Sequence, residues 1–137
     1  MFMGLDISNG LFGNFHLSWV GAGWFGDWCL ESQLPSPFIG WDGCNDGDQC
    51  KLGMDKEHIL LAIEWCGALE KKFPEIANLG KSLLENPPDL YLYLYPHRKS
   101  GELDSAISEE EWGWRAVAAW YAILRRGVET GDTIEYW

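Results

Sequence analysis

The first fifty residues contain no lysine and no arginine, although they hold six acidic residues and four of the nine tryptophans. A segment without cations cannot bind a nucleic-acid backbone by releasing counterions from the phosphates. The whole chain is acidic too, with 10 basic and 21 acidic residues and a net charge of −11. This balance disfavours nucleic acids and anionic membrane surfaces as partners, and it favours solubility and basic protein partners.

Long hydrophobic runs and the motifs of common enzymes are also missing. No apolar run reaches the ~18 residues of a transmembrane helix, and the N-terminus lacks the basic and apolar regions of a secretion signal. We therefore expect a cytoplasmic protein whose four cysteines are reduced thiols with packing roles. There is no glycine-rich nucleotide loop, no nucleophile elbow and no zinc-protease helix. The sequence thus offers no recognisable catalytic centre.

The chain is predicted to form a single α+β domain over residues 1–137, with a small, mainly antiparallel sheet packed against two main helices. These helices are expected at about residues 55–73 and 109–126. Residues 1–54 contain ten glycines, which favour loops and short strands and disfavour a long helix. Leucine and tyrosine alternate from Leu90 to Tyr95, which predicts a central strand that is covered on both faces.

The last predicted helix has the clearest boundary signals. Ser108 and Glu111 have the spacing of a capping box, and Gly127 is suited to the position just after the helix. Between them, residues 116–124 are apolar on every face, which is typical of a buried helix. Pro74 either breaks the earlier helix or begins a shorter one that runs to about Glu85.

Three segments resemble a group of short, uncharacterised bacterial and phage proteins that begin Met-Gly-Leu-Asp-Ile-Ser. These segments are residues 3–8, the acidic turn at 101–108, and the closing stretch at 121–136. No activity is established for the group, so the resemblance implies a phage or prophage context and no particular chemistry.

An acidic loop at residues 42–48 is the best candidate for a metal site. Asp42 and Asp46 occupy the first and fifth positions of a calcium loop, and Asp48 could add its backbone carbonyl. Cys44 stands at the third position and Gly53 replaces the closing glutamate, so two ligands of a calcium loop are missing. The alternative is a polar turn whose side chains bond their own backbone. A disulfide between Cys44 and Cys50 would require an oxidising compartment.

A polar turn after the predicted central strand holds the weak catalytic candidates His97, Glu102 and Asp104. A histidine with two nearby carboxylates could perform acid–base chemistry, which would make the protein a hydrolase. No activated nucleophile or oxyanion donor accompanies them in the sequence. We therefore regard an enzymatic role as an alternative and not as the leading hypothesis.

The leading hypothesis is a non-enzymatic protein that docks an acidic, aromatic surface on a basic protein partner. Charge would steer the encounter, and tryptophan anchors would supply affinity. The residues expected to carry this surface are Trp24, Trp28, Trp41, Asp42, Asp46 and Asp48. A pocket for a sugar or nucleotide, floored by tryptophans, is the second hypothesis. The same tryptophans could instead simply pack the core.

Overall fold

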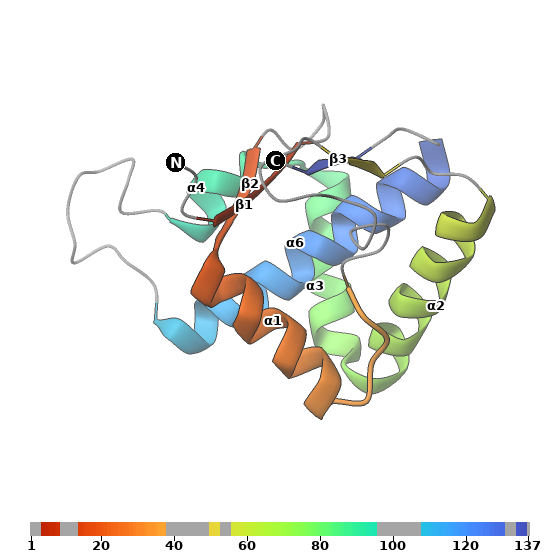
Figure 1. Ribbon diagram of the computed structural model, residues 1–137, viewed down its shortest axis with the longest axis horizontal. Coiled ribbons are helices and arrows are strands. Elements are labelled where there is room, and N and C mark those ends of the chain that lie inside the picture. Colours follow the sequence, from red (N-terminus) through yellow and green to blue (C-terminus); the bar gives the residue numbers. More distant parts are fainter. Residues whose placement is uncertain are drawn as a thin grey trace.

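A computed structural model describes the backbone of residues 4–8, 14–37, 50–52, 56–95, 108–130 and 134–136 (Figure 1). Side chains are described for residues 23–37, 57–90, 92–95 and 108–130. Five helices are present in this part of the chain. They are α1 (Trp19–Glu31), α2 (Lys56–Lys72), α3 (Pro74–Glu85), α4 (Leu90–Leu94) and α6 (Glu109–Thr130).

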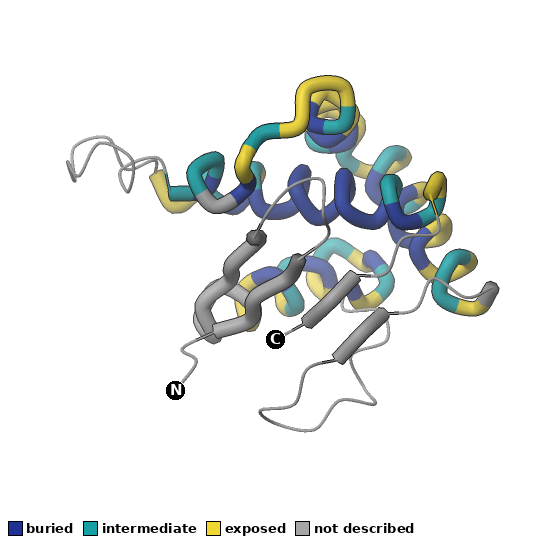
Figure 2. Tube along the Cα trace, turned by 90° about the horizontal axis from the view of Figure 1, so that it is seen from above, coloured by how far each residue is buried: buried dark blue, intermediate teal, exposed yellow. Residues whose placement is uncertain are grey.

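Helix α6 forms the centre of the molecule, as its apolar sequence predicts. Every residue from Ala116 to Leu124 is buried, and Figure 2 shows this helix as the longest buried stretch of the chain. The backbone N–H of Glu111 donates to the Ser108 hydroxyl at 3.1 Å, so the predicted N-cap is confirmed. The predicted C-terminal end is wrong, because the helix passes through the buried Gly127 and ends at Thr130.

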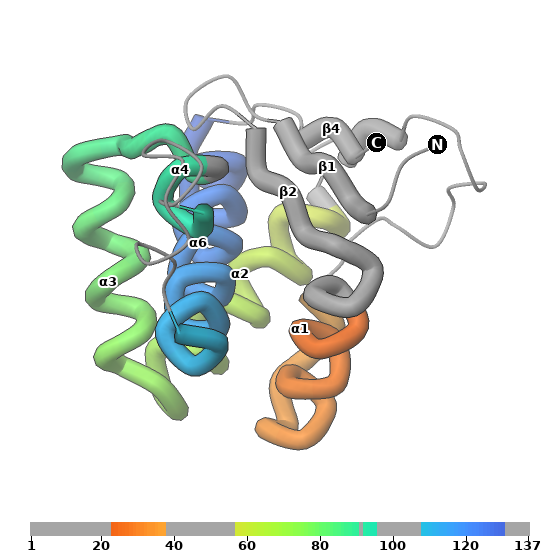
Figure 3. The backbone as a smooth tube through the Cα atoms, turned by 90° about the vertical axis from the view of Figure 1, so that its left-hand side faces the viewer, coloured from red at the N-terminus to blue at the C-terminus, as the bar shows by residue number. Residues whose placement is uncertain are grey.

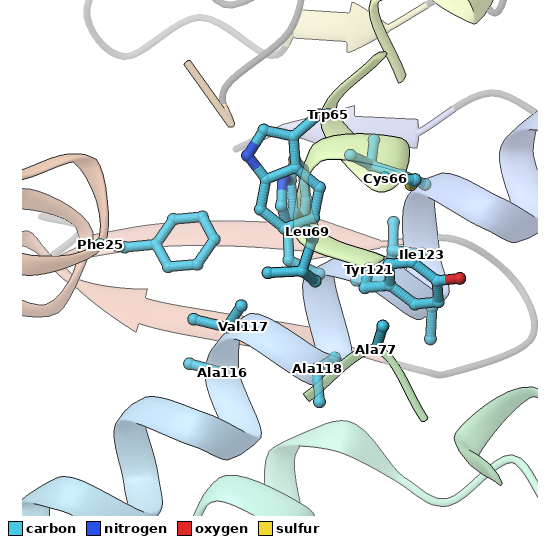
Figure 4. Packing of buried hydrophobic residues seen from close by; sticks show 14 of the residues in the cluster. Phe25, Trp65, Cys66, Leu69, Ala77, Ala116, Val117, Ala118, Tyr121 and Ile123 are labelled. Atoms are coloured by element: carbon cyan, nitrogen blue, oxygen red, sulfur yellow. The ribbon is translucent and has the colours of Figure 1, made fainter. Parts of the chain in front are cut away.

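Helices α2 and α3 confirm the sequence prediction for residues 55–85. Pro74 is the first residue of α3, where its fixed backbone angle and missing N–H are tolerated. Helix α3 packs closely on α6, and α1 lies on the other side of α6 (Figures 1 and 3). Figure 4 shows Trp65 and Leu69 of α2 meeting Val117 and Tyr121 of α6 in the core.

The prediction that residues 1–54 contain no long helix is wrong, because α1 spans 13 residues and includes several glycines. Packing compensates for the weak helix propensity of these glycines. Phe25 and Cys29 lie one turn apart, and both are buried. The Phe25 ring lies 6.1 Å from the ring of Trp65 in α2, so α1 is fixed by contacts with a distant part of the chain.

The C-terminal end of α1 is a Schellman motif built on a residue other than glycine. The N–H of Leu34 donates to the carbonyl of Cys29 at 2.8 Å, and that of Gln33 donates to Leu30 at 3.1 Å. Gln33 adopts the left-handed conformation with a φ of 60°. The ammonium group of Lys72 donates to the carbonyls of Ser32 and Gln33 at 2.8 and 3.0 Å, which joins the ends of α1 and α2.

Replacing Gln33 with glycine should therefore stabilise the protein. The left-handed conformation costs a residue with a Cβ roughly 1 kcal/mol, and glycine adopts it freely. We expect the free energy of unfolding, measured with urea, to rise by about 0.5–1 kcal/mol. An alanine at the same position keeps the Cβ and serves as the control. A loss of stability in Gln33→Gly would contradict the assigned backbone conformation.

The predicted central strand at residues 90–95 is wrong, because Leu90–Leu94 forms the short helix α4. Leu90 and Leu94, one helical turn apart, are buried, whereas Leu92 is only partly buried. In an alternating Leu-Tyr sequence, leucines recur both two and four residues apart. The pattern is therefore compatible with a five-residue helix as well as with a strand. Arg115 of α6 closes the end of α4 by donating to the carbonyl oxygen of Tyr93 at 2.7 Å.

The predicted α+β fold class, with a sheet packed against two main helices, is also wrong. Among the residues whose side chains are described, every buried hydrophobic residue lies in one of the five helices, except Leu34 just after α1. The described part of the chain is therefore mainly helical. Short backbone pairings join β1 (Gly4–Ser8), β2 (Asn14–Ser18), β3 (Cys50–Leu52) and β4 (Ile134–Tyr136) in the antiparallel order β2-β1-β4-β3.

Cys29 and Cys66 are free thiols buried in the helical core, as predicted for two of the four cysteines. Burial raises the pKa of Cys29 to about 11, and the neighbouring Trp65 side chain partly offsets this effect. Burial raises the pKa of Cys66 to about 12, with Arg125 lowering it and Glu70 raising it to smaller extents. Both groups are therefore uncharged in the folded protein at neutral pH.

These raised pKa values predict a loss of stability at alkaline pH. The ordinary pKa of a cysteine thiol is 9.0. Above this pH the two thiols ionise in the unfolded chain, whereas in the folded protein they keep their protons. The folded state then binds more protons, so stability falls with rising pH by up to about 1.4 kcal/mol per pH unit for each thiol. Urea unfolding at pH 8 and pH 10.5 under reducing conditions measures this loss. The double variant Cys29→Ala/Cys66→Ala should show a smaller decline, and an equal decline would contradict the assignment.

Candidate binding groove

A groove of about 370 Å³ lies between α1, the first turn of α3 and the N-terminal half of α6. We call this feature the aromatic groove. Its lining consists of three tryptophans, two glutamates and three small or aliphatic residues. These residues are Trp24, Trp28, Ile76, Glu109, Glu110, Gly113, Trp114 and Val117.

Helical spacing places these side chains together. Trp24 and Trp28 are four residues apart in α1, and Glu110 and Trp114 are four residues apart in α6. Residues at this spacing share one face of a helix. The side chain of Trp24 is 39% exposed and that of Trp114 is 52% exposed. Two large aromatic rings from separate helices are therefore accessible at the same surface.

Gly113 allows α1 to approach α6 at the groove. A Cβ atom at position 113 would lie 2.7 Å from Cη2 and 2.9 Å from Cζ2 of Trp24. Distances this short do not occur between real atoms at rest, so any larger residue must displace the indole. Because Gly113 has no side chain, the Trp24 ring can pack directly against the backbone of α6 at this position.

Further aromatic contacts hold the groove tryptophans in place. The Trp24 and Trp28 rings are stacked, with centroids 6.3 Å apart and planes at 23°. Trp112 meets Trp24 edge-on at 5.9 Å and 66°. Phe73, between α2 and α3, lies 4.9 Å from Trp28. Because aromatic pairs add to the energy of area burial, Trp24 and Trp28 are preorganised within this cluster.

A second hollow of about 420 Å³ adjoins the groove and shares Ile76 and Trp114 with it. Its remaining lining comes from the junction of α2 and α3. These residues are Lys72, Phe73, Pro74, Glu75 and Leu79. The two hollows therefore meet at Ile76 and Trp114.

The charge of this surface is mainly negative. Glu109 and Glu110 line the groove and Glu75 lines the adjoining hollow, and all three are exposed. Lys72 is the one basic residue among the described residues that line either hollow. Its ammonium group already donates to the two carbonyls at the end of α1. The surface thus combines exposed indoles with carboxylates.

The structure brings together two of the six predicted binding residues. Trp24 and Trp28 both line the groove. The remaining candidates lie outside the described residues, so their predictions stay untested. These are Trp41, Asp42, Asp46 and Asp48 of the acidic loop, with its calcium and Cys44–Cys50 alternatives, and His97, Glu102 and Asp104 of the polar turn. Within the described side chains, no cluster of three histidines, cysteines or acids could hold a metal.

Sequence reasoning missed the contribution of α6 to the groove. From the sequence alone, Glu109, Glu110 and Trp114 were given no role in binding. Their signal was visible in the sequence, because an acid and an indole four residues apart share one helix face. What could not be inferred was the pairing of this face with α1, since α1 was not expected to be a helix.

Comparisons with protein-family models, with curated proteins and with solved structures found no match to this chain. Among the described helices, none combines the length and apolar character that crossing a membrane requires. Functional inference therefore depends on the chemistry of the groove itself.

Proposed function

We propose that the protein is a non-enzymatic binding protein whose aromatic groove docks on a basic protein partner. The observation that carries this proposal is the meeting of exposed Trp24 and Trp114 with Glu109 and Glu110 in one groove. Tryptophans that are fixed before binding lose little conformational entropy when a partner covers them, and they are frequent energetic anchors of interfaces. We place this activity in the cytoplasm, in the phage or prophage context that the sequence resemblance implies.

The electrostatics support a basic partner over an acidic or neutral one. Acidic side chains exceed basic ones by eleven over the whole chain. Glu109 and Glu110 of α6 line the groove, and Glu75 of α3 lines the adjoining hollow. Complementary charge raises association rates and discourages wrong partners. Nucleotides and other phosphate ligands would meet repulsion at the same carboxylates.

Binding of defined peptides tests the proposal. Three peptides of equal length, one basic, one neutral and one acidic, are titrated into the protein by calorimetry at low and at physiological salt. We expect the basic peptide alone to bind, with an affinity that falls as salt rises because the rim charges are exposed. Failure of the basic peptide to bind at low salt would refute the proposal.

A matched pair of charge variants locates the binding site. Glu109→Gln/Glu110→Gln should weaken binding of the basic peptide about fivefold, as expected for exposed charge pairs. Glu57→Gln/Glu64→Gln removes the same charge from exposed positions on α2 that do not line the groove. This control should bind like the parent protein. Equal weakening by both variants would indicate attraction by the net charge alone and no specific site.

A sugar is the second candidate ligand, because a stacked tryptophan pair beside carboxylates can present both a flat apolar face and hydrogen-bond acceptors. Quenching of tryptophan fluorescence across a panel of neutral mono- and oligosaccharides distinguishes this alternative. Saturable quenching by a sugar, lost in Trp114→Ala, would favour it over a basic protein.

A further inference from the structure

We infer that the side chain captured in the aromatic groove is an arginine of the partner protein. Its guanidinium group would lie flat on an exposed indole and form hydrogen bonds to Glu109 or Glu110. This inference rests on the proposed function and specifies the partner's chemistry. It is drawn from a guanidinium site that the protein already contains on the same helix.

Arg115 of α6 shows how this helix binds a guanidinium group internally. The Cζ atom of Arg115 lies 4.7 Å from the centre of the Tyr93 ring. Its Nη2 donates to Oε1 of Glu111 at 3.0 Å, and its Nη1 donates to the Tyr93 carbonyl at 2.7 Å. An aromatic face and a glutamate from the first turn of α6 together hold this cation.

The groove also presents a glutamate together with an aromatic ring. Glu110 and Trp114 both line it, and they lie four residues apart on one face of α6. In the internal site the ring comes from Tyr93 of α4 and the cation is Arg115. We assign the cation that would complete this arrangement to the partner protein. None of the described residues that line the aromatic groove is basic.

Arginine fits these groups better than the other biological cations do. Its guanidinium is planar, is weakly hydrated and can stack on an indole while its N–H groups still donate to a carboxylate in the ring plane. The lysine ammonium is compact and strongly hydrated, so it gains less from an open aromatic face. A trimethylated lysine contacts aromatic rings well, but it has no N–H group to donate to Glu109 or Glu110.

Three peptides of equal charge test this inference by calorimetry. They are hexaarginine, hexalysine and hexa(trimethyllysine), each titrated into the parent protein at the same salt concentration. We expect hexaarginine to bind about tenfold more tightly than hexalysine, as expected for a cation–π contact combined with a charged hydrogen bond. It should also bind more tightly than the trimethylated peptide.

Two variants connect the arginine preference to the groove. Trp114→Ala removes a largely exposed ring, so it should fold normally and reduce the preference for arginine to about twofold or less. Gly113→Ala retains every charged and aromatic side chain but displaces the Trp24 indole, and it should reduce the preference as well. Gly67→Ala is the control, because a Cβ at that position meets no atom within 4 Å.

The outcomes separate this inference from the proposed function. Equal binding of the arginine and lysine peptides, weakened by Glu109→Gln/Glu110→Gln, would overturn the arginine assignment and leave the basic partner in place. Tightest binding of the trimethylated peptide would also overturn it. Absence of binding by all three peptides at low salt would refute both proposals. An arginine preference that Trp114→Ala leaves intact would place the guanidinium elsewhere on the protein.

Discussion

Replacing Trp120 with alanine should lower the free energy of unfolding by about 4–5 kcal/mol, because it leaves a large core cavity and a buried carbonyl without its donor. The Trp120 side chain is 1% exposed at the centre of α6. Its indole Nε1 donates to the carbonyl oxygen of Pro37 at 2.7 Å. This bond ties the segment after α1 to the core helix.

Phenylalanine at position 120 separates the two contributions. It keeps most of the apolar volume but cannot donate to Pro37, so we expect a smaller loss of about 2 kcal/mol. Urea unfolding followed by circular dichroism measures both variants. Trp114→Ala, which removes an exposed indole from the same helix, should change stability by less than about 1 kcal/mol. Equal effects of Trp120→Ala and Trp114→Ala would contradict the assigned burial.

Alanine at Gly80 should destabilise the protein by about 3 kcal/mol through overpacking where α3 crosses α6. The added Cβ would lie 2.5 Å from Cδ1 of Tyr121 and 2.9 Å from the carbonyl oxygen of Ala118. The carbonyl belongs to the buried backbone of α6. The Tyr121 ring is also restrained, because its hydroxyl donates to Glu70 of α2 at 2.5 Å. The helices must therefore separate to accept the methyl group.

Gly67 in the middle of α2 provides the matched comparison. It is exposed, and a Cβ there would meet nothing within 4 Å. Gly67→Ala should stabilise the protein by roughly 0.5–1 kcal/mol, because alanine is the better helix former. Opposite signs for the two substitutions, measured by urea unfolding, are the expected result. A neutral Gly80→Ala variant would contradict the close α3–α6 crossing.

The sequence predicted correctly those helices whose ends or buried faces are marked by residues within the helix itself. The Ser108 cap and the apolar run that follows it define most of α6, and Pro74 marks the start of α3. Residues 90–94 were misassigned because a short alternating segment carries no local distinction between strand and helix. Only the contacts of Leu90 and Leu94 with the helical core and the bond from Arg115 to the end of α4 favour the helix.

Helix α1 shows why the candidate site was only half predicted. Its glycines argue locally against a helix, and the contacts that favour one come from Trp65 and Phe73, at least forty residues away in the sequence. Trp24 and Trp28 were identified from composition alone. The role of Gly113 in the packing of Trp24 depends on a contact between α1 and α6. No periodicity within either segment could reveal that contact.

Mapping of the tryptophan signals by NMR tests the groove most directly. The nine indole N–H signals are assigned by single Trp→Phe variants and followed as hexaarginine is added. We expect the signals of Trp24, Trp28 and Trp114 to shift with one common saturation curve, while those of the buried Trp65 and Trp120 remain in place. Saturable shifts that spare Trp24 and Trp114, or the absence of any saturable shift, would contradict a binding site in the aromatic groove.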